Sequence, residues 1–240
     1  MKSLTSFQEL EALGEGLSKA YITKTHRWNS RCFDIEGFVK EYLRLAVIYE
    51  FFAEDDGNRI GFLANGKDPL KVRRSGKKLS IVFPKDTIVI EKKLLQESES
   101  SRRRFTIAHE AAHKILELHV PMQAAPVFHT DYSYGNGQKW DDLKKTLSLN
   151  EAFANRLGAV VLMPGFLIAK TLKKYNDGRT IRCYDGGIFS QEDKLNIQRM
   201  ANTLGVSYSA FITRLKELNL IECRPIEEYI ESTLLAGDAV

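Results

Sequence analysis

The sequence is poor in cysteine, with only Cys32, Cys183 and Cys223 among its 240 residues. Their number is odd and their spacing is wide, which argues against a disulfide framework. No two of them have the CxxC spacing of a metal-binding knuckle. The simplest interpretation is that all three are small buried thiols in a reducing compartment.

Long apolar runs are also missing, and no stretch approaches the roughly 20 apolar residues that a transmembrane helix needs. The first residues, MKSLTSFQELEALGEG, are polar and acidic and do not resemble the apolar core of a signal peptide. Internal repeats and low-complexity tracts are absent from the sequence as well. We therefore expect a cytoplasmic protein that has no membrane partner.

Neither sign of charge dominates, because 35 lysines and arginines face 31 acidic residues, for a net charge of +4. Such a weakly basic chain permits an acidic partner but does not require nucleic acid, and we expect no nucleic-acid partner. With 43% hydrophobic and 28% charged residues, the composition is ordinary for a globular protein. The length suits one large domain or two small ones.

The order of patterns along the chain predicts an α+β fold with a small antiparallel sheet rather than a parallel βαβ sheet. Helical spacing of apolar residues occurs in residues 5–20, from Asp34 onward, in 102–119, in 148–162 and twice after Ser190, with a break at Gly205. Asp34 can cap the helix that it begins. Strand patterns occur in residues 45–52, 79–83 and 87–94, and the last two predict a hairpin around Pro84. Lys67–Lys78 contains six basic residues and one acid, and its Pro69 and Gly76 predict a loop.

One stretch carries a recognisable chemical pattern, the HExxH sequence formed by His109, Glu110 and His113 within RRRFTIAHEAAHKIL. Residues four apart lie on one face of a helix, with Cβ atoms about 5–6 Å apart, so two imidazoles can converge on one ion. Glu110 is rotated from that face by about 100°, where it can accept a proton from water activated by the metal. A purely structural zinc site gives no reason for this glutamate, so the pattern favours a catalytic site.

The third ligand has three candidates. His119 follows His113 by six residues, as in the HExxHxxGxxH pattern, but Leu116 occupies the glycine position. If the helix continues, His119 points about 240° away from His113. His129 lies in the long segment 121–148, where nothing in the sequence fixes it.

Glu151, within NEAFANRLGAVVLMP, begins an apolar helix. The helix dipole favours a carboxylate there, and a carboxylate beside a buried helix is costly unless it is paired or bound to metal. Asn155 follows four residues later and can hold Glu151 or a substrate in place. A solvated glutamate near a helix N-terminus stays open as the alternative.

Together the two blocks, RRRFTIAHEAAHKIL and NEAFANRLGAVVLMP, resemble the ImmA/IrrE family of zinc metallo-endopeptidases, over roughly residues 34–220. The resemblance implies a Zn²⁺ ion held by His109, His113 and Glu151, with Glu110 as the catalytic base. It also implies a protein substrate, because members typically cleave helix-turn-helix repressors encoded beside them, in mobile-element or stress responses.

We therefore predict a zinc metallopeptidase-like core at 34–190, preceded by a helical extension at 1–33 and followed by a helical region at 191–240 that packs on the core. In this core a zincin-like HExxH helix pair would accompany the small sheet. The predicted function is zinc-dependent endoproteolysis of a helix-turn-helix repressor. The alternative is a regulator that does not cleave, and that binds a partner repressor or DNA through the same cleft and residues 200–220.

Other segments supply candidates for secondary roles. Residues 200–220 resemble a helix-turn-helix, but Ser207, Tyr208 and Ser209 begin the second helix where a DNA reader needs basic or amide groups, so packing or partner docking is favoured. His129, Tyr132 and Tyr134 are candidates for stabilising the transition state. Three arginines precede the metal helix, where the dipole disfavours cations, and Glu97 or Glu99 are their expected partners.

Overall fold

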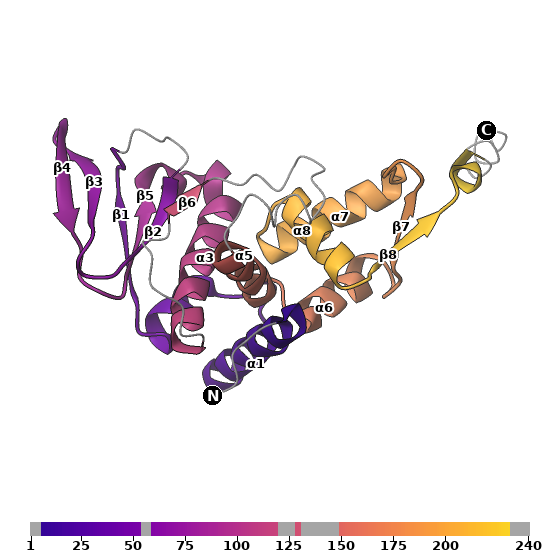
Figure 1. Cartoon of the computed structure of the whole chain (residues 1–240). Coiled ribbons are helices and arrows are strands. Elements are labelled where there is room, and N and C mark those ends of the chain that lie inside the picture. The colour runs from indigo at the N-terminus through magenta and orange to yellow at the C-terminus, as the bar shows by residue number, and fades with distance from the viewer. Residues whose placement is uncertain (1–5, 54–58, 120–127, 131–148, 231–240) are drawn as a thin grey trace. The chain divides into compact units, whose positions relative to one another are not determined.

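The computed structural model of the chain describes residues 6–53, 59–119, 128–130 and 149–230 (Figure 1). The chain divides into two compact units, residues 1–164 and 165–240. The sequence analysis had placed the end of the core after residue 190 instead.

In the described residues of the first unit a run of five strands lies between helices at either end, which confirms the mixed α+β class. Its helical elements are α1 (Phe7–Thr25), α2 (Ile35–Gly37), the π-helix η1 (Phe38–Tyr42), the 3₁₀ turns η2 (Lys92–Leu95) and η3 (Glu97–Glu99), α3 (Ser100–His119) and α5 (Leu149–Leu162). Its strands are β1 (Ala46–Glu50), β2 (Arg59–Ala64), β3 (Pro69–Arg74), β4 (Lys77–Val82), β5 (Thr87–Glu91) and β6 (Phe128–Thr130). The second unit contains α6 (Gly165–Tyr175), β7 (Ile181–Tyr184), α7 (Gln191–Leu204), α8 (Tyr208–Glu217) and β8 (Ile221–Arg224).

The main sheet has the strand order β1-β5-β2-β6. The prediction of an antiparallel sheet was right for β2 with β5 and β6 but wrong for β1, which pairs with β5 in parallel. The predicted hairpin around Pro84 was also wrong, because β4 and β5 belong to different sheets. The reason is that every residue of β5 is buried, so this strand takes an interior place with a neighbour on each edge.

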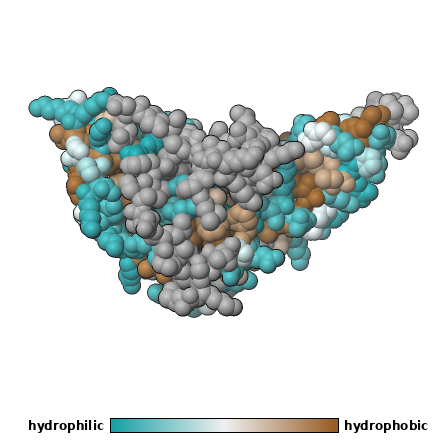
Figure 2. Space-filling model, in the orientation of Figure 1, coloured by the Kyte–Doolittle hydropathy of each residue, from teal (hydrophilic) through white to brown (hydrophobic). Residues whose placement is uncertain are grey.

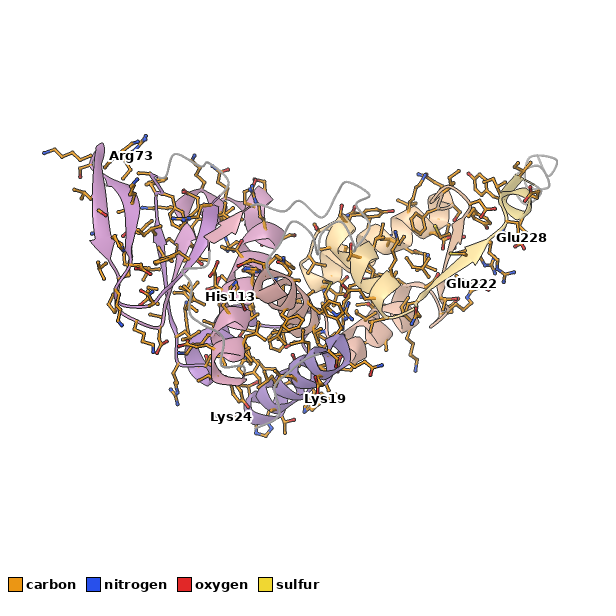
Figure 3. All side chains as sticks on the ribbon, viewed as in Figure 1. Lys19, Lys24, Arg73, His113, Glu222 and Glu228 are labelled. Carbon is orange, nitrogen blue, oxygen red and sulfur yellow. The ribbon has the colours of Figure 1, made fainter. Side chains whose placement is uncertain are left out.

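The prediction of a loop at Lys67–Lys78 was wrong, because β3 and β4 form an antiparallel ribbon over their full lengths. Pro69 stands at the first position of β3, where a missing N–H is tolerated. Ser75 and Gly76 both have positive φ, 48° and 76°, as a two-residue type I′ turn requires. Figure 3 labels Arg73 near the tip of this ribbon, which is mainly hydrophilic in Figure 2.

The inner side of the ribbon is apolar, and it covers one face of the main sheet. Leu70 and Val72 of β3 are buried against Phe62 of β2 and Val89 of β5, together with Phe83. The opposite face of β2 and β5 packs against α3. The sheet therefore lies between the ribbon and the helix that carries the HExxH sequence.

Helix α5 packs between two other helices of the first unit, α3 and α1. Gly158 makes the contact with α3, since a Cβ atom there would lie 3.2 Å from the carbonyl carbon of Ala108 and from the backbone nitrogen of His109. On the other side of α5, Gly14 of α1 forms the contact, since a Cβ atom on Gly14 would lie 2.5 Å from Cγ1 of Val160 in α5. Both glycines thus permit a close approach that any side chain would prevent.

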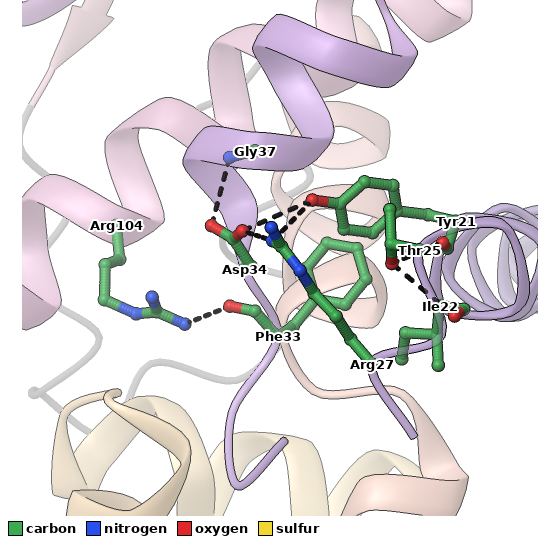
Figure 4. Close-up of polar contacts among 8 residues, drawn as sticks. All are labelled: Tyr21, Ile22, Thr25, Arg27, Phe33, Asp34, Gly37 and Arg104. Carbon is green, nitrogen blue, oxygen red and sulfur yellow. Dashed lines mark hydrogen bonds and ion pairs between the residues drawn. The ribbon is translucent and has the colours of Figure 1, made fainter. Parts of the chain in front are cut away.

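A polar cluster fastens the segment between α1 and α2 to the start of α3 (Figure 4). Asp34 caps α2, as predicted, and its Oδ2 also accepts a hydrogen bond from the hydroxyl of Tyr21 at 3.3 Å and pairs with Arg27. Arg104 donates from Nη2 to the carbonyl oxygen of Phe33 at 2.7 Å. The hydrogen bond to Phe33 explains why Arg104 can lie in the first turns of α3, where the helix dipole disfavours a cation.

Arg102, two positions before Arg104, has the acidic partner that the sequence predicts. Arg102 pairs with Glu99 at 3.3 Å, one of the two glutamates expected as partners.

The second unit carries the predicted break between two helices. Gly205 ends α7 in the left-handed conformation, with φ 66°, and Ser207 caps the start of α8 through the Ala210 N–H. Within α8, Arg214 is fully buried and pairs with Glu217 at 3.4 Å. DNA binding by this helix pair stays a prediction.

Among the described residues, no single helix is both long and apolar enough to cross a membrane. The bent pair of α5 and α6 passes the same test of length and composition, as the core helices of globular proteins also do.

The close contact of α1 with α5 gives a test with a matched control. Gly14→Ala should lower the free energy of unfolding by about 1–3 kcal/mol, because its new methyl group overlaps Val160. Gly16→Ala, two residues along the same helix, meets nothing within 4 Å and should raise it by about 0.5–1 kcal/mol. Urea denaturation of both variants measures the difference, and equal effects would contradict the packing of α1 on α5.

Candidate metal centre

His109 and His113 on α3 and Glu151 on α5 converge at one point between the two helices. One ligand atom from each residue lies within 4.8 Å of the other two. The Nε2 atoms of the two histidines are 2.9 Å apart, and the Glu151 carboxylate oxygens lie 3.3 Å from His109 Nε2 and 3.4 Å from His113 Nε2. Figure 3 labels His113 in this region, where α3 passes α5.

The local sequence explains this convergence. The four-residue spacing of the histidines puts both imidazoles on the face of α3 that meets α5, with ring centroids 4.6 Å apart. Glu151 lies in the first turn of α5, where the helix dipole favours a carboxylate. The Glu151 side chain keeps 14% of its surface exposed, whereas His109 is fully buried, so the glutamate marks the side of the site open to solvent.

His109 is neutral at physiological pH, so its contact with Glu151 is no ordinary ion pair. Burial lowers the pKa of His109 to about 4, against a smaller upward effect of its hydrogen bond with Asn155. Burial also raises the pKa of Glu151, which the charge of His113 partly counteracts. The site therefore offers a neutral imidazole at His109, which is the form that binds metal.

Asn155 fixes the orientation of the first imidazole. Its Oδ1 lies 2.8 Å from His109 Nδ1, and with the proton on Nδ1 this nitrogen donates while the Nε2 lone pair faces Glu151 and His113. The sequence analysis expected Asn155 to hold Glu151 or a substrate. In the structure its side chain contacts His109. Asn155 lies on the face of α5 that meets α3, one turn after Glu151, and from there it reaches across to the imidazole.

Glu110 is fully buried, and neither of its carboxylate oxygens makes a regular hydrogen bond in the part of the chain that the structure describes; the backbone of Leu63 makes only a weaker contact with the carboxylate. Burial raises the pKa of Glu110 well above its ordinary value, and the neighbouring charge of Glu151 adds to this rise. The backbone of Leu63 and the charge of Arg59, both on β2, counteract only part of it. A carboxyl group kept in this state can take up a proton and hold it.

Strand β2 forms one wall around this glutamate. A Cβ atom on Gly61 would lie 2.5 Å from Glu110 Oε1, so a glycine is needed where the strand passes the carboxylate. Arg59 lies two residues before Gly61 and therefore on the same face of β2. The pairing of β2 with β6 is irregular between Arg59 and Phe62. The sequence analysis missed Gly61 and Arg59, because they lie beside α3 only through the pairing of β2 with β5, which no local pattern predicts.

For the other predicted candidates the structure describes the backbone at most. α3 continues through His119, so its backbone makes no turn after Leu116 of the kind that the HExxHxxGxxH pattern requires. His129 is part of β6, but its side chain lies outside the description, and Tyr132 and Tyr134 fall outside the described residues altogether. Their roles in stabilising a transition state stay predictions.

Comparison with known proteins adds no relative. No family model matches the chain, and no curated protein matches it. The interpretation of the site thus depends on its geometry and on the two sequence blocks.

The role of Asn155 can be tested with a pair of substitutions. Asn155→Leu removes the acceptor for His109 and should weaken zinc binding by about 10- to 100-fold. Asn155→Asp keeps an oxygen at the same position and should bind zinc at least as well as the parent protein. Competition titration against a chromophoric chelator gives both affinities, and equal weakening would show that Asn155 only fills space.

The buried carboxyl group predicts a pH-dependent stability in the metal-free protein. Because its pKa is raised in the folded state, the stability that the protonated form contributes is complete below about pH 4.5 and is lost as the pH rises through the folded pKa. Glu110→Gln cannot ionise, so its stability advantage over the parent should be small near pH 4.5 and should grow with pH.

Urea denaturation in the presence of a chelator, repeated between pH 4.5 and 8, measures this advantage. The lowered pKa of His109 destabilises both proteins as the pH falls below 6.5 and therefore cancels in the comparison. A difference between the two proteins that does not change with pH would contradict the raised pKa of Glu110.

Proposed function

We propose that this protein is a zinc-dependent metallo-endopeptidase. The observation that carries the proposal is the combination of a convergent ligand set, His109, His113 and Glu151, with a buried acid, Glu110, beside it. A ligand set alone is compatible with a structural metal. Burying a carboxyl group that makes no regular hydrogen bond with the described residues is costly, and catalysis is the use that we propose for it.

The donor set suits zinc. Two imidazole nitrogens and one carboxylate are a common ligand set of catalytic zinc, which keeps a further position open for water or substrate. The ligand atoms already face one another, and Asn155 orients His109 as the outer partner of such sites does. The same donors also accept other divalent ions, so zinc is our choice within a narrow group.

When bound, the ion supplies Lewis acidity, which activates water and polarises the scissile carbonyl. Glu110 accepts the proton of the attacking water on a carboxylate oxygen, and its raised pKa allows it to hold that proton until the leaving amine needs it. Gly61 leaves room for this carboxylate, and the positive charge of Arg59 prevents its pKa from rising further.

The substrate class we propose is a helix-turn-helix repressor, on the strength of the resemblance of both sequence blocks to ImmA/IrrE peptidases. The competing function is a regulator that binds such a partner without cleaving it. The buried acid favours the peptidase, because a protein that only binds its partner has no use for a carboxyl group buried without a regular hydrogen bond among the described residues.

Metal analysis and cleavage assays together test the proposal. The parent protein should hold about one zinc per chain, and His113→Ala and Glu151→Ala should lose stoichiometric binding. Glu110→Gln should keep its zinc but cleave about 10²- to 10⁴-fold more slowly. Glu117→Gln, which removes an exposed carboxylate from the same helix, is the matched control and should change neither property.

The cleavage assay uses a helix-turn-helix protein encoded beside this gene, with fragments detected by mass spectrometry and a chelator as the blank. Full activity of Glu110→Gln would remove this residue as the base. Zinc retained by Glu151→Ala would place the third ligand elsewhere. A zinc-loaded protein that binds the repressor and leaves it intact would favour the regulator.

A further inference from the structure

The fold brings two distant cysteines together in the second unit. Cys183 on β7 and Cys223 on β8 are directly paired residues of a parallel two-stranded sheet. Neighbouring strands are about 4.7–4.9 Å apart, and paired residues of a parallel ladder point to the same face. This separation lies within the Cα–Cα range of about 4.4–6.8 Å that a disulfide can bridge.

The two thiols differ in their access to solvent. Both are free, and Cys223 is exposed, whereas Cys183 is only 8% exposed. Burial raises the pKa of the Cys183 thiol, and the neighbouring Cys223 raises it further. Because Cys183 is buried and Cys223 is exposed, a small reagent meets the Cys223 thiol first. An exposed thiol with a second thiol beside it is the arrangement of a reactive and a resolving cysteine.

We propose that Cys183 and Cys223 form an oxidation site, at which a hydroperoxide converts the two thiols into a disulfide. In the first step the Cys223 thiolate attacks the peroxide, an S–O bond forms and the O–O bond breaks, releasing water or an alcohol. In the second step the Cys183 sulfur attacks Cys223, the S–S bond forms and the S–O bond breaks, releasing water. Two thiols are oxidised while one peroxide is reduced.

The expected effect of this disulfide is on the second unit. β7 and β8 form a sheet of two strands, and an isolated pair of strands is marginally stable. The segment between the two cysteines contains α7 and α8, so the cross-link closes a loop around both helices. Oxidation should therefore fasten β8 to β7 and restrict the unfolded state of this unit, and a dithiol should reverse it.

This inference does not depend on the proposed peptidase activity, because none of its residues belongs to the metal centre. The structure also corrects the interpretation of three small buried thiols, because only Cys183 is buried, whereas Cys32 is partly exposed and Cys223 is exposed.

The test is to treat the whole protein with hydrogen peroxide, block the remaining thiols with a maleimide, and map disulfides by mass spectrometry of the digest. The parent protein should lose two of its three thiols and yield a cross-linked Cys183–Cys223 peptide pair. Cys32→Ser should give the same pair. Dithiothreitol should restore the thiols in both.

Two controls separate native pairing from indiscriminate oxidation. In denaturant, peroxide should give mixed pairings that include Cys32, because the register of β7 and β8 is then lost. Oxidation should raise the unfolding midpoint by several degrees in the parent and in Cys32→Ser but not in Cys183→Ser. Native oxidation of Cys223 to a sulfinic acid, with Cys183 left as a thiol, or a native disulfide that involves Cys32, would overturn the proposal.

Discussion

The contact between α3 and α5 at Gly158 determines where every group of the metal centre lies. Glu151, Asn155 and Gly158 are spaced by four and three residues, so they share one face of α5. Gly158 brings that face against the backbone of Ala108 and His109. Since the helices approach so closely there, Asn155 reaches His109 and, one turn earlier, Glu151 reaches both imidazoles. A larger residue at this crossing would separate the carboxylate from the histidines.

The centre places polar groups where burial penalises them. His109 and Glu110 are both fully buried, and the pKa of each moves toward the neutral form. Such groups persist only when the surrounding packing is firm enough to hold them. Here the apolar contacts of the sheet with the ribbon and of α5 with α1 supply that packing, away from the reacting groups. The division explains how one small unit can be tightly packed and still hold buried ionisable groups.

Local patterns in the sequence were sufficient to predict most of the helices, the cap at Asp34 and the residues that converge on the candidate site, but they missed α6 after Pro164. They were insufficient wherever long-range pairing decides. Pro69 and Gly76 are signals of a loop, yet they fit equally well the start and the turn of a β-ribbon. β5 is apolar enough for a hairpin with β4, but its burial on both faces places it between β1 and β2. The proximity of Gly61 and Arg59 to Glu110 depends on the packing of β2 against α3, which no local pattern predicts.

The position of α5 between α1 and α3 ties the beginning of the chain to the metal centre. α1 packs on α5 through Gly14, and Arg156 of α5 donates a hydrogen bond to Glu11 of α1 at 3.1 Å. An ion bound to Glu151 would stabilise α5 in the position that α1 also requires, so docking of the first helix and affinity for the ion would be thermodynamically linked. Linkage of this kind is reciprocal. A molecule that captures α1 would loosen the ion, and removal of the ion would make α1 easier to capture.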